Sequence, residues 1–142
     1  TIGGSSRNNG LFFKEDGLKL YIADSKTQAI EEFNLSTAWD ITTITFVHAF
    51  TVSGISSNPY GVFFRPDGRK MYVASRQDFA RGIAEYDLGT PWDTSTASLF
   101  QKFIPSPGFN PEGVFFRDNG LKMYIAGSVS GDDSIYEYDL EA

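Results

Sequence analysis

A stretch of 14 residues occurs three times in this chain of 142 residues, and it constrains the fold more than any other feature. The copies occupy residues 10–23, 61–74 and 113–126, so they begin 51 and then 52 residues apart. The second copy reads Gly-Val-Phe-Phe-Arg-Pro-Asp-Gly-Arg-Lys-Met-Tyr-Val-Ala. A near-constant period of this length indicates an array of similar supersecondary units, each packed against its neighbours.

Each copy predicts a β-hairpin. Two short apolar segments flank a turn that contains Asp-Gly in the first two copies and Asn-Gly in the third. Such pairs favour tight hairpin turns because Gly, Asn and Asp adopt a positive φ at low cost. We therefore expect the first two strands of each unit at residues 11–13 and 19–23, at 62–64 and 70–74, and at 114–116 and 122–126.

A polar loop and a third strand follow each hairpin. The loops occupy residues 24–29, 75–82 and 127–134 and differ in length. The segments after them share an Ile at the start, a Glu in the middle and a Leu at the end, with an aromatic residue between. This composition favours third strands at residues 30–35, 83–88 and 135–140.

Each second strand carries a lysine and each third strand a glutamate. We expect these residues to form cross-strand ion pairs worth about 0.2–1 kcal/mol each. Because the pair recurs in every unit, it indicates a structural role rather than a catalytic one. The expected pairs are Lys19 with Glu32, Lys70 with Glu85 and Lys122 with Glu137.

A connector with a Trp-Asp pair follows the third strand in the first two units, as Trp39-Asp40 and Trp92-Asp93. We interpret each tryptophan as a packed aromatic residue and each aspartate as a cap. Segments rich in Thr and Phe follow. They predict fourth strands at residues 45–52 and 98–104.

The third unit ends at residue 142 without a Trp-Asp connector or a fourth strand. Four short antiparallel strands in a repeat of this length describe a β-propeller blade. The expected fold is therefore all-β, with about three four-stranded antiparallel blades, the last lacking its outer strand. The blades lie approximately at residues 10–52, 61–104 and 113–140 of a single segment, 1–142. Because the chain begins with Thr1 rather than Met, we expect either a processed protein or a piece of a longer one.

The repeat pattern resembles that of a known group of propellers. Phe-x-x-Asp-Gly-x-Lys-Met-Tyr-Val-Ala is followed by Glu-Tyr-Asp-Leu-x-Thr-x-Trp-Asp-x-Ser-Thr-Ala, and together they resemble YVTN/NHL-type repeats. A similar variant is met in phage structural proteins and in bacterial surface or secreted proteins. The resemblance covers nearly the whole chain, and it implies a propeller located outside the cell or in a virion. It does not imply one activity, because propellers include hydrolases, lectins and interaction platforms.

Three blades do not close a ring, since propellers have about four blades or more. An open row would expose apolar blade faces, which soluble monomers avoid. We therefore expect either a homo-oligomer or further blades in a longer chain. Self-association is the preferred expectation, because two copies would give about six blades.

Composition narrows the classes of partner. The formal net charge is −6 and no basic run occurs, which disfavours nucleic acid and anionic membrane surfaces. No apolar stretch approaches the ~20 residues needed to cross a bilayer. The absence of cysteine excludes disulfides, thiolate catalysis and Cys-based zinc sites.

In the propeller family, ligands usually bind on the face built by two sets of loops. One set enters the innermost strand and the other joins the second and third strands. Loops on a rigid scaffold often carry specificity. Carried onto this sequence, the candidate ligand-binding residues are Tyr60, Arg76, Asp78, Arg81, Glu112, Asp132 and Asp133.

We assign no catalytic residue, metal or cofactor from the sequence. His48 is the only histidine, it falls in a predicted fourth strand, and no Gly-x-Ser-x-Gly motif accompanies it. The preferred expectation is a non-enzymatic propeller module, located in a virion or outside the cell, that binds a protein or a glycan.

Two other functions remain open. One is a calcium-dependent, lactonase-like hydrolase, which would need acidic residues such as Asp24, Asp78 and Glu112 gathered at the channel mouth. The other is a lectin, which would stack sugars on an aromatic side chain of Trp39, Trp92 or Tyr60.

Overall fold

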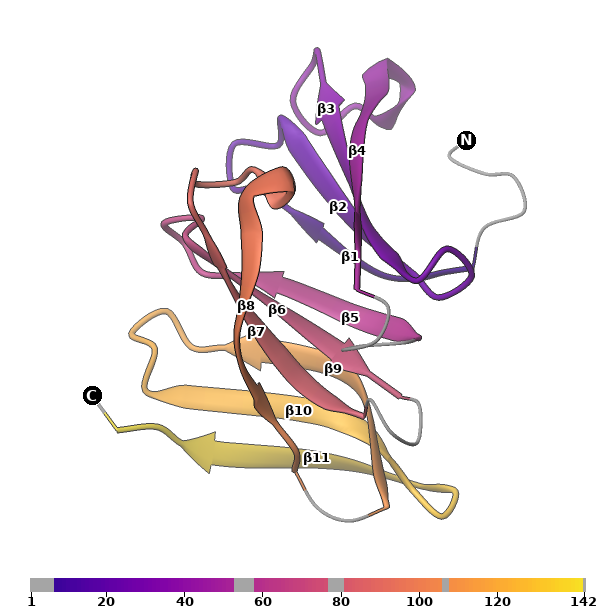
Figure 1. Cartoon of the computed structure of the whole chain (residues 1–142), viewed down its shortest axis with the longest axis vertical. Coiled ribbons are helices and arrows are strands. Elements are labelled where there is room, and N and C mark those ends of the chain that lie inside the picture. Colours follow the sequence, from indigo (N-terminus) through magenta and orange to yellow (C-terminus); the bar gives the residue numbers. More distant parts are fainter. Residues whose placement is uncertain (1–6, 53–57, 77–80, 106–107, 142) are drawn as a thin grey trace.

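The structure is a computed structural model that describes residues 7–52, 58–76, 81–105 and 108–141. These residues form strands and two short 3₁₀ helices (Figure 1). None of the described helices is long and apolar enough to cross a membrane. The elements are β1 (Asn8–Phe13), β2 (Lys19–Asp24), β3 (Ala29–Leu35), η1 (Ile41–Thr43), β4 (Ile44–Thr51), β5 (Pro59–Phe64), β6 (Lys70–Ser75), β7 (Gly82–Leu88), η2 (Thr94–Thr96), β8 (Ala97–Phe103), β9 (Phe109–Phe116), β10 (Lys122–Val129) and β11 (Asp132–Asp139).

The described strands form three antiparallel sheets, each a meander in sequence order. The first is β1-β2-β3-β4, the second is β5-β6-β7-β8, and the third is β9-β10-β11 within residues 108–141. Strands β1, β5 and β9 contact one another in turn, so they are the innermost strands of a row of blades (Figure 1). The predicted all-β fold of about three propeller blades, the last without an outer strand, is confirmed.

The hairpin turns form as the Asp-Gly and Asn-Gly pairs predict. Gly17, Gly68 and Gly120 have φ values of 71°, 70° and 71°, in the region that favours glycine. The side chain before each glycine accepts a hydrogen bond from the backbone N–H two positions after itself, at 2.9 to 3.1 Å. These turns fix the register of each inner hairpin.

The two connectors adopt one conformation. Trp39 and Trp92 have positive φ values of 64° and 65°, and the backbone N–H of each donates to the carbonyl of the hairpin glycine in its own blade at 2.9 Å. Asp40 and Asp93 then cap η1 and η2 by accepting backbone N–H bonds at 2.9 and 3.0 Å. The predicted capping role of the aspartates is confirmed. The short 3₁₀ helices that they cap were not predicted.

The third blade differs from its predicted boundaries. We expected a polar loop over residues 127–134, but β10 continues to Val129 and β11 begins at Asp132. Only Ser130 and Gly131 form the turn, with φ values of 52° and 95°. The primed geometry of this two-residue turn matches the twist of a hairpin, so the strands extend to its edge.

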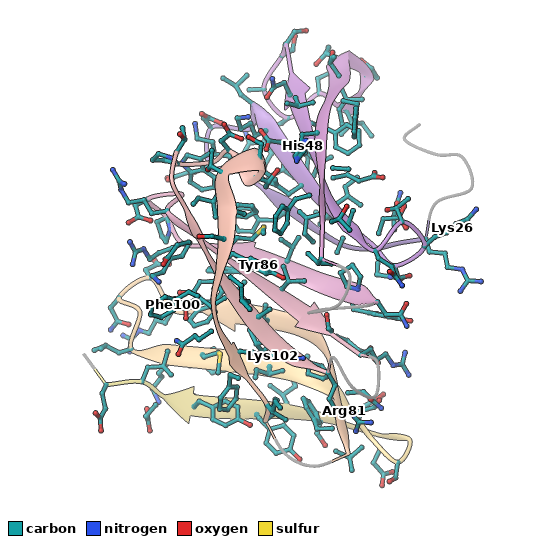
Figure 2. All side chains as sticks on the ribbon, in the orientation of Figure 1. Lys26, His48, Arg81, Tyr86, Phe100 and Lys102 are labelled. Atoms are coloured by element: carbon teal, nitrogen blue, oxygen red, sulfur yellow. The ribbon has the colours of Figure 1, made fainter. Side chains whose placement is uncertain are left out.

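Most of the core lies between the blades. Tyr21 of the first blade packs on Phe64 of the second, with ring centroids 4.1 Å apart, and its hydroxyl donates to the carbonyl of Trp92 at 2.6 Å. Tyr86 lies in the same layer, where the ring of Phe50 meets it edge-on at 5.2 Å (Figure 2). Aromatic pairs of this kind add about 0.5–1.5 kcal/mol each beyond their buried area.

The predicted cross-strand ion pairs are present in all three blades. Lys70 and Lys122 each reach the glutamate of the neighbouring strand at 2.5 Å, and Lys19 contacts Glu32 in the same way. Glu32 is buried, and its other oxygen accepts from the backbone N–H and the hydroxyl of Thr94 at 3.0 and 2.8 Å. Glu32 was predicted to stabilise its own blade, and it also joins the first blade to the second.

Candidate functional site

Three of the predicted binding residues meet at one edge of the second and third blades. Tyr60 lies in β5, Arg76 directly follows β6, and Glu112 lies in β9. The Nη1 atom of Arg76 is 3.3 Å from Oε1 of Glu112, and its guanidinium carbon is 5.3 Å from the centroid of the Tyr60 ring. We call these three residues the Arg76 cluster.

The backbone brings the cluster together by a close approach of the inner strands. A Cβ atom on Gly61 would lie 2.6 Å from the carbonyl oxygen of Glu112, so only glycine fits there. The register of β5 and β6 shifts between Pro59 and Gly61, which is a bulge next to Tyr60. Bulges of this kind re-aim side chains at the rim of a sheet. The cluster is thus built where inner strands begin and second strands end.

The cluster is open to solvent. The side chains of Arg76 and Glu112 are each 41% exposed. A hollow of about 370 Å³ adjoins Glu112, and its lining also includes Asp133 and Ile135. The carboxylate of Glu112 therefore lines the hollow, and the exposed guanidinium of Arg76 lies next to that carboxylate, outside the lining.

The remaining predicted site residues are more dispersed. Asp133 lines the hollow beside Glu112, whereas Asp132 is exposed at the first position of β11. Arg81 is half-buried and immediately precedes β7 (Figure 2). Asp78 lies outside the described residues.

The acidic cluster that a calcium-dependent site would need is not formed by the described residues. Asp24 is buried, and its Oδ1 accepts backbone N–H bonds from Arg7, Lys26 and Thr27 at 3.1, 2.7 and 3.2 Å. It therefore caps a turn instead of facing the hollow by Glu112. Across the described ranges, no group of three or more His, Cys, Asp or Glu side chains could hold a metal ion.

The aromatic residues considered for sugar stacking have different surroundings. Trp92 lies between blades, with its ring stacked at 5.6 Å on Phe64 and at 6.3 Å on Phe12. Trp39 is exposed, and Tyr60 faces Arg76. The stacking surface of Trp92 is therefore used by the core.

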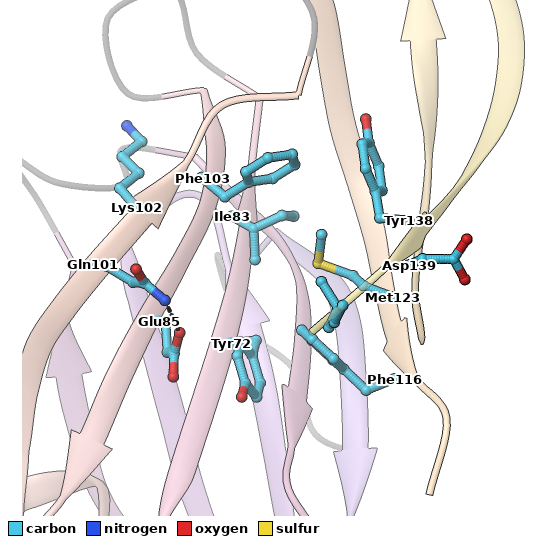
Figure 3. A pocket seen from close by; sticks show the side chains of 11 residues that line it. Tyr72, Ile83, Glu85, Gln101, Lys102, Phe103, Phe116, Met123, Tyr138 and Asp139 are labelled. Atoms are coloured by element: carbon cyan, nitrogen blue, oxygen red, sulfur yellow. Dashed lines mark hydrogen bonds between the residues drawn. The ribbon is translucent and has the colours of Figure 1, made fainter. Parts of the chain in front are cut away.

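A second hollow, which the sequence did not lead us to expect, lies between the second and third blades (Figure 3). It measures about 350 Å³ and combines apolar side chains with Glu85, whose Oε2 accepts from Gln101 Nε2 at 2.7 Å. Burial raises the pKa of Tyr72 in its wall to about 12 and lowers the pKa of Lys102. Its apolar lining includes Ile83, Phe103, Phe116, Met123 and Tyr138.

The single histidine does not belong to either hollow. His48 lies on β4 (Figure 2) opposite Glu32, and it lines a third, open hollow of about 540 Å³ together with Trp92. Glu32, which joins the first two blades, also lines this hollow. The sequence-based decision to assign no catalytic role to His48 stays a prediction.

Comparison with known proteins identifies the class of fold. No protein-family model matches this sequence, and no curated protein matches it significantly. Solved structures do match. A Bacteroides uniformis protein described as a 6-phosphogluconolactonase has a TM-score of 0.65 at 18% identity, over 99% of this chain and 38% of that one.

Two further structures agree with this fold. The periplasmic gluconolactonase of Pseudomonas aeruginosa has a TM-score of 0.66 at 12% identity, over 96% of this chain and 38% of that one. The β-propeller domain of Myceliophthora thermophila Swd1 has a TM-score of 0.63 at 12% identity, over 94% of this chain and 40% of that one. This chain is thus a β-propeller segment, and it spans about two fifths of the length of the structures that it matches.

These comparisons correct one expectation. The sequence led us to expect a protein that is not an enzyme, but several similar structures are described as lactonases, which contradicts that assignment. The wrong inference came from looking for histidine, cysteine or a serine elbow. Arginine and glutamate from different blades can also form a reactive pair, and no local motif marks them.

Proposed function

We propose that this chain is part of a β-propeller hydrolase that opens lactone rings, and that the Arg76 cluster is its site. The observation that carries the proposal is the Arg76–Glu112 ion pair, which stands at the rim of the blades beside an open hollow. The similar structures described as lactonases support the same reaction class.

Glu112 supplies the base. Its carboxylate lies in the wall of the hollow, where a water molecule can stand between it and a bound lactone. The carboxylate takes a proton from that water as the oxygen attacks the carbonyl carbon of the lactone. General-base assistance of this kind contributes about 10²–10⁴-fold to a rate.

Arg76 supplies the positive charge. The carbonyl oxygen becomes an anion in the tetrahedral intermediate, and a guanidinium at hydrogen-bond distance stabilises that charge. The bond from the carbonyl carbon to the ring oxygen then breaks, and the protonated Glu112 returns its proton to the departing alkoxide. The product is an open hydroxy acid, and the ring of Tyr60 holds the guanidinium in place from its face.

No step of this reaction is assigned to calcium. The alternative considered from the sequence required a set of acidic ligands, and the described residues do not fit it, because Asp24 is occupied by backbone N–H groups. The proposed chemistry therefore depends on this chain's own carboxylate and guanidinium.

The test is hydrolysis of glucono-δ-lactone by the purified chain, with the release of acid as the measured quantity. We expect Glu112→Gln to lower the rate by about 10²–10⁴-fold because an amide cannot accept the proton. Asp132→Asn is the matched control, since this exposed acid does not line the hollow and its rate should stay unchanged. A wild-type rate no higher than spontaneous hydrolysis, or full activity in the folded Glu112→Gln variant, would show that the proposal is wrong.

The finer sequence-based assignments are also proposals. The Phe-x-x-Asp-Gly-x-Lys-Met-Tyr motif supports a repeat of the YVTN/NHL type, and with it a location outside the cell or in a virion. One of the similar structures comes from a periplasmic protein. Cell fractionation of the source organism tests the location: a signal confined to the cytosolic fraction would contradict it.

A further inference from the structure

Two asparagine–glycine pairs occur in this chain, and the structure places them differently. Asn9-Gly10 lies within β1, whereas Asn119-Gly120 lies in the turn between β9 and β10 (Figure 1). Asparagine is a chemically labile residue, and a following glycine favours loss of its side-chain amide because no Cβ hinders the backbone nitrogen. The reaction also needs a mobile backbone and access of water, so its rate at each pair depends on the surrounding structure.

The chemistry requires only the chain and water. The backbone nitrogen of the glycine attacks Cγ of the asparagine, and the bond from Cγ to the side-chain nitrogen breaks. Ammonia leaves with the proton of the attacking nitrogen, and a cyclic succinimide remains. Water then adds to one of the two carbonyl carbons of the ring and opens it to aspartate or isoaspartate. The net change is one water consumed and one ammonia released, with nothing oxidised or reduced.

The turn at Asn119 is open to this reaction. Residues 117–120 are all exposed. The side-chain Oδ1 of Asn119 accepts the backbone N–H of Leu121 at 3.1 Å, and the N–H of Gly120 donates to the carbonyl of Arg117 at 2.7 Å. Both bonds lie within one turn, so they break without disturbing a contact between blades. Local openings of this kind cost the least free energy in a folded chain.

The equivalent turns show that a cover over the glycine leaves the preceding side chain in water. Trp39 and Trp92 pack over Gly17 and Gly68, where a Cβ would lie 2.4 and 2.3 Å from the indole nitrogen. The aspartates before these glycines are nevertheless 41% and 45% exposed. The exposure of Asn119 is therefore a property of the turn itself.

The contact between the first two blades protects Asn9-Gly10. The Nδ2 atom of Asn9 donates to the carbonyl of Pro59 at 3.2 Å, and a Cβ on Gly10 would lie 2.3 Å from the carbonyl oxygen of Tyr60. The backbone of Gly10 thus lies directly against β5, and the asparagine side chain is held away from it. The pair reacts only when β1 separates from β5, which is a larger and rarer opening than that of a turn.

The third turn already suits the aspartate product. In the other two blades its position holds Asp16 and Asp67, and each carboxylate accepts the same backbone N–H bond that Asn119 accepts. Arg117 stands where Arg65 pairs with Asp67, so its guanidinium can bind the new carboxylate. Isoaspartate would place an extra methylene group in the backbone and break the hydrogen bonds that close the turn.

We propose that Asn119 is a site of spontaneous deamidation, selected over Asn9 by its exposed turn, and that aspartate is a stable product there. The reaction gives the third turn the carboxylate of the first two, and it adds one negative charge to a chain whose formal net charge is −6. The modified chain keeps its fold, because Arg117 binds the new carboxylate. The argument uses the two asparagine–glycine pairs and does not depend on the proposed hydrolase activity.

The experiment is incubation of the folded 142-residue chain in mildly alkaline buffer, followed by mass spectrometry of its proteolytic peptides. We expect Asn119 to react at least about tenfold faster than Asn9, since a small difference in opening free energy produces a ratio of this size. Asn119→Asp provides the reference peptide for the aspartate product, which chromatography separates from isoaspartate. Asn119→Gln is the matched control, because its longer side chain closes the corresponding ring far more slowly.

The same incubation in concentrated urea distinguishes structure from sequence. With the chain unfolded, the two pairs should react at similar rates, because neither is then held by a strand or a turn. A folded chain in which Asn9 reacts as fast as Asn119 would overturn the proposal. So would a ratio that persists in urea, a folded turn that does not react while the unfolded chain does, or a product that is isoaspartate alone.

Discussion

The contact between the first and second blades contains a tryptophan, whereas the contact between the second and third contains a hollow. Trp92 fills the first contact, where its ring stacks on Phe12, Tyr21 and Phe64 at 5.6 to 6.5 Å. In the second contact, Tyr72 and Phe116 pack at 4.1 Å, as the equivalent pair does in the first. No described residue stands over that pair as Trp92 does. The two contacts therefore share a packed tyrosine–phenylalanine pair and differ in whether a tryptophan covers that pair.

The glutamates of the third strands show the same difference. Glu32 accepts two hydrogen bonds from Thr94 of the next blade, whereas Glu85 accepts from Gln101 of its own blade. In the first contact, the connector of the second blade thus covers the surface that the inner hairpin of the first blade provides. The described residues of the third blade do not include a connector at the corresponding position.

The largest expected effect comes from removing the tryptophan. Trp92→Ala should lower the free energy of unfolding by about 3–5 kcal/mol, because it leaves a cavity between two blades. Trp39→Ala is the matched control at the equivalent exposed position, and in dilute solution it should cost less than about 1.5 kcal/mol. Urea unfolding measures both. Equal losses in the two variants would show that the first contact does not depend on Trp92.

The turn glycines should show an intermediate effect. Gly68 and Gly120 share a positive φ, so alanine at either position costs about 1–2 kcal/mol in backbone strain. A Cβ on Gly68 would also lie 2.3 Å from the Trp92 ring, whereas one on Gly120 would have nothing within 4 Å. Gly68→Ala should therefore destabilise the chain by about 1–3 kcal/mol more than Gly120→Ala. Thermal unfolding of the two variants checks the difference, and a larger loss in Gly120→Ala would contradict it.

The sequence predicts the blades well because their signals are local. The hairpin turns at Gly17 and Gly68 need a positive φ, and the pairs such as Lys70 with Glu85 follow from the alternation of strands. The loop between the second and third strands of the third blade was misplaced for a reason that is also local. Ser130-Gly131 is itself a turn signal, and the surrounding polar residues concealed the strands that it joins.

The candidate site was harder to predict, because its residues come from different blades. Tyr60, Arg76 and Glu112 were each selected from loops, but their mutual contact depends on how closely two inner strands approach. Trp39 and Trp92 lie in the same motif and differ in burial because Trp92 packs against the first blade, whereas no described blade covers Trp39. Such differences depend on packing between units, which a repeat pattern does not encode.

The smallest expected effect concerns acid stability at the same two turns. The Arg65 guanidinium and the Arg69 N–H hydrogen-bond the Asp67 carboxylate and lower its pKa to about 2. An unfolded aspartate has a pKa of about 3.9, so this group stabilises the fold above about pH 4, and the contribution is lost as the pH falls toward 2. Because Asp67 is 45% exposed, the contribution should stay below about 1 kcal/mol.

The third blade has an amide at the position of Asp67, and this allows a reciprocal experiment. Asp67→Asn should make the unfolding free energy less dependent on pH between 5 and 2. Asn119→Asp should make it more dependent, because Arg117 stands where Arg65 stands in the second blade. Urea titrations at pH 7, 4 and 2.5 measure both slopes. Unchanged slopes in both variants would mean that the turn carboxylate contributes no acid-dependent stability. The two turns would then differ only in the tryptophan that packs over Gly68.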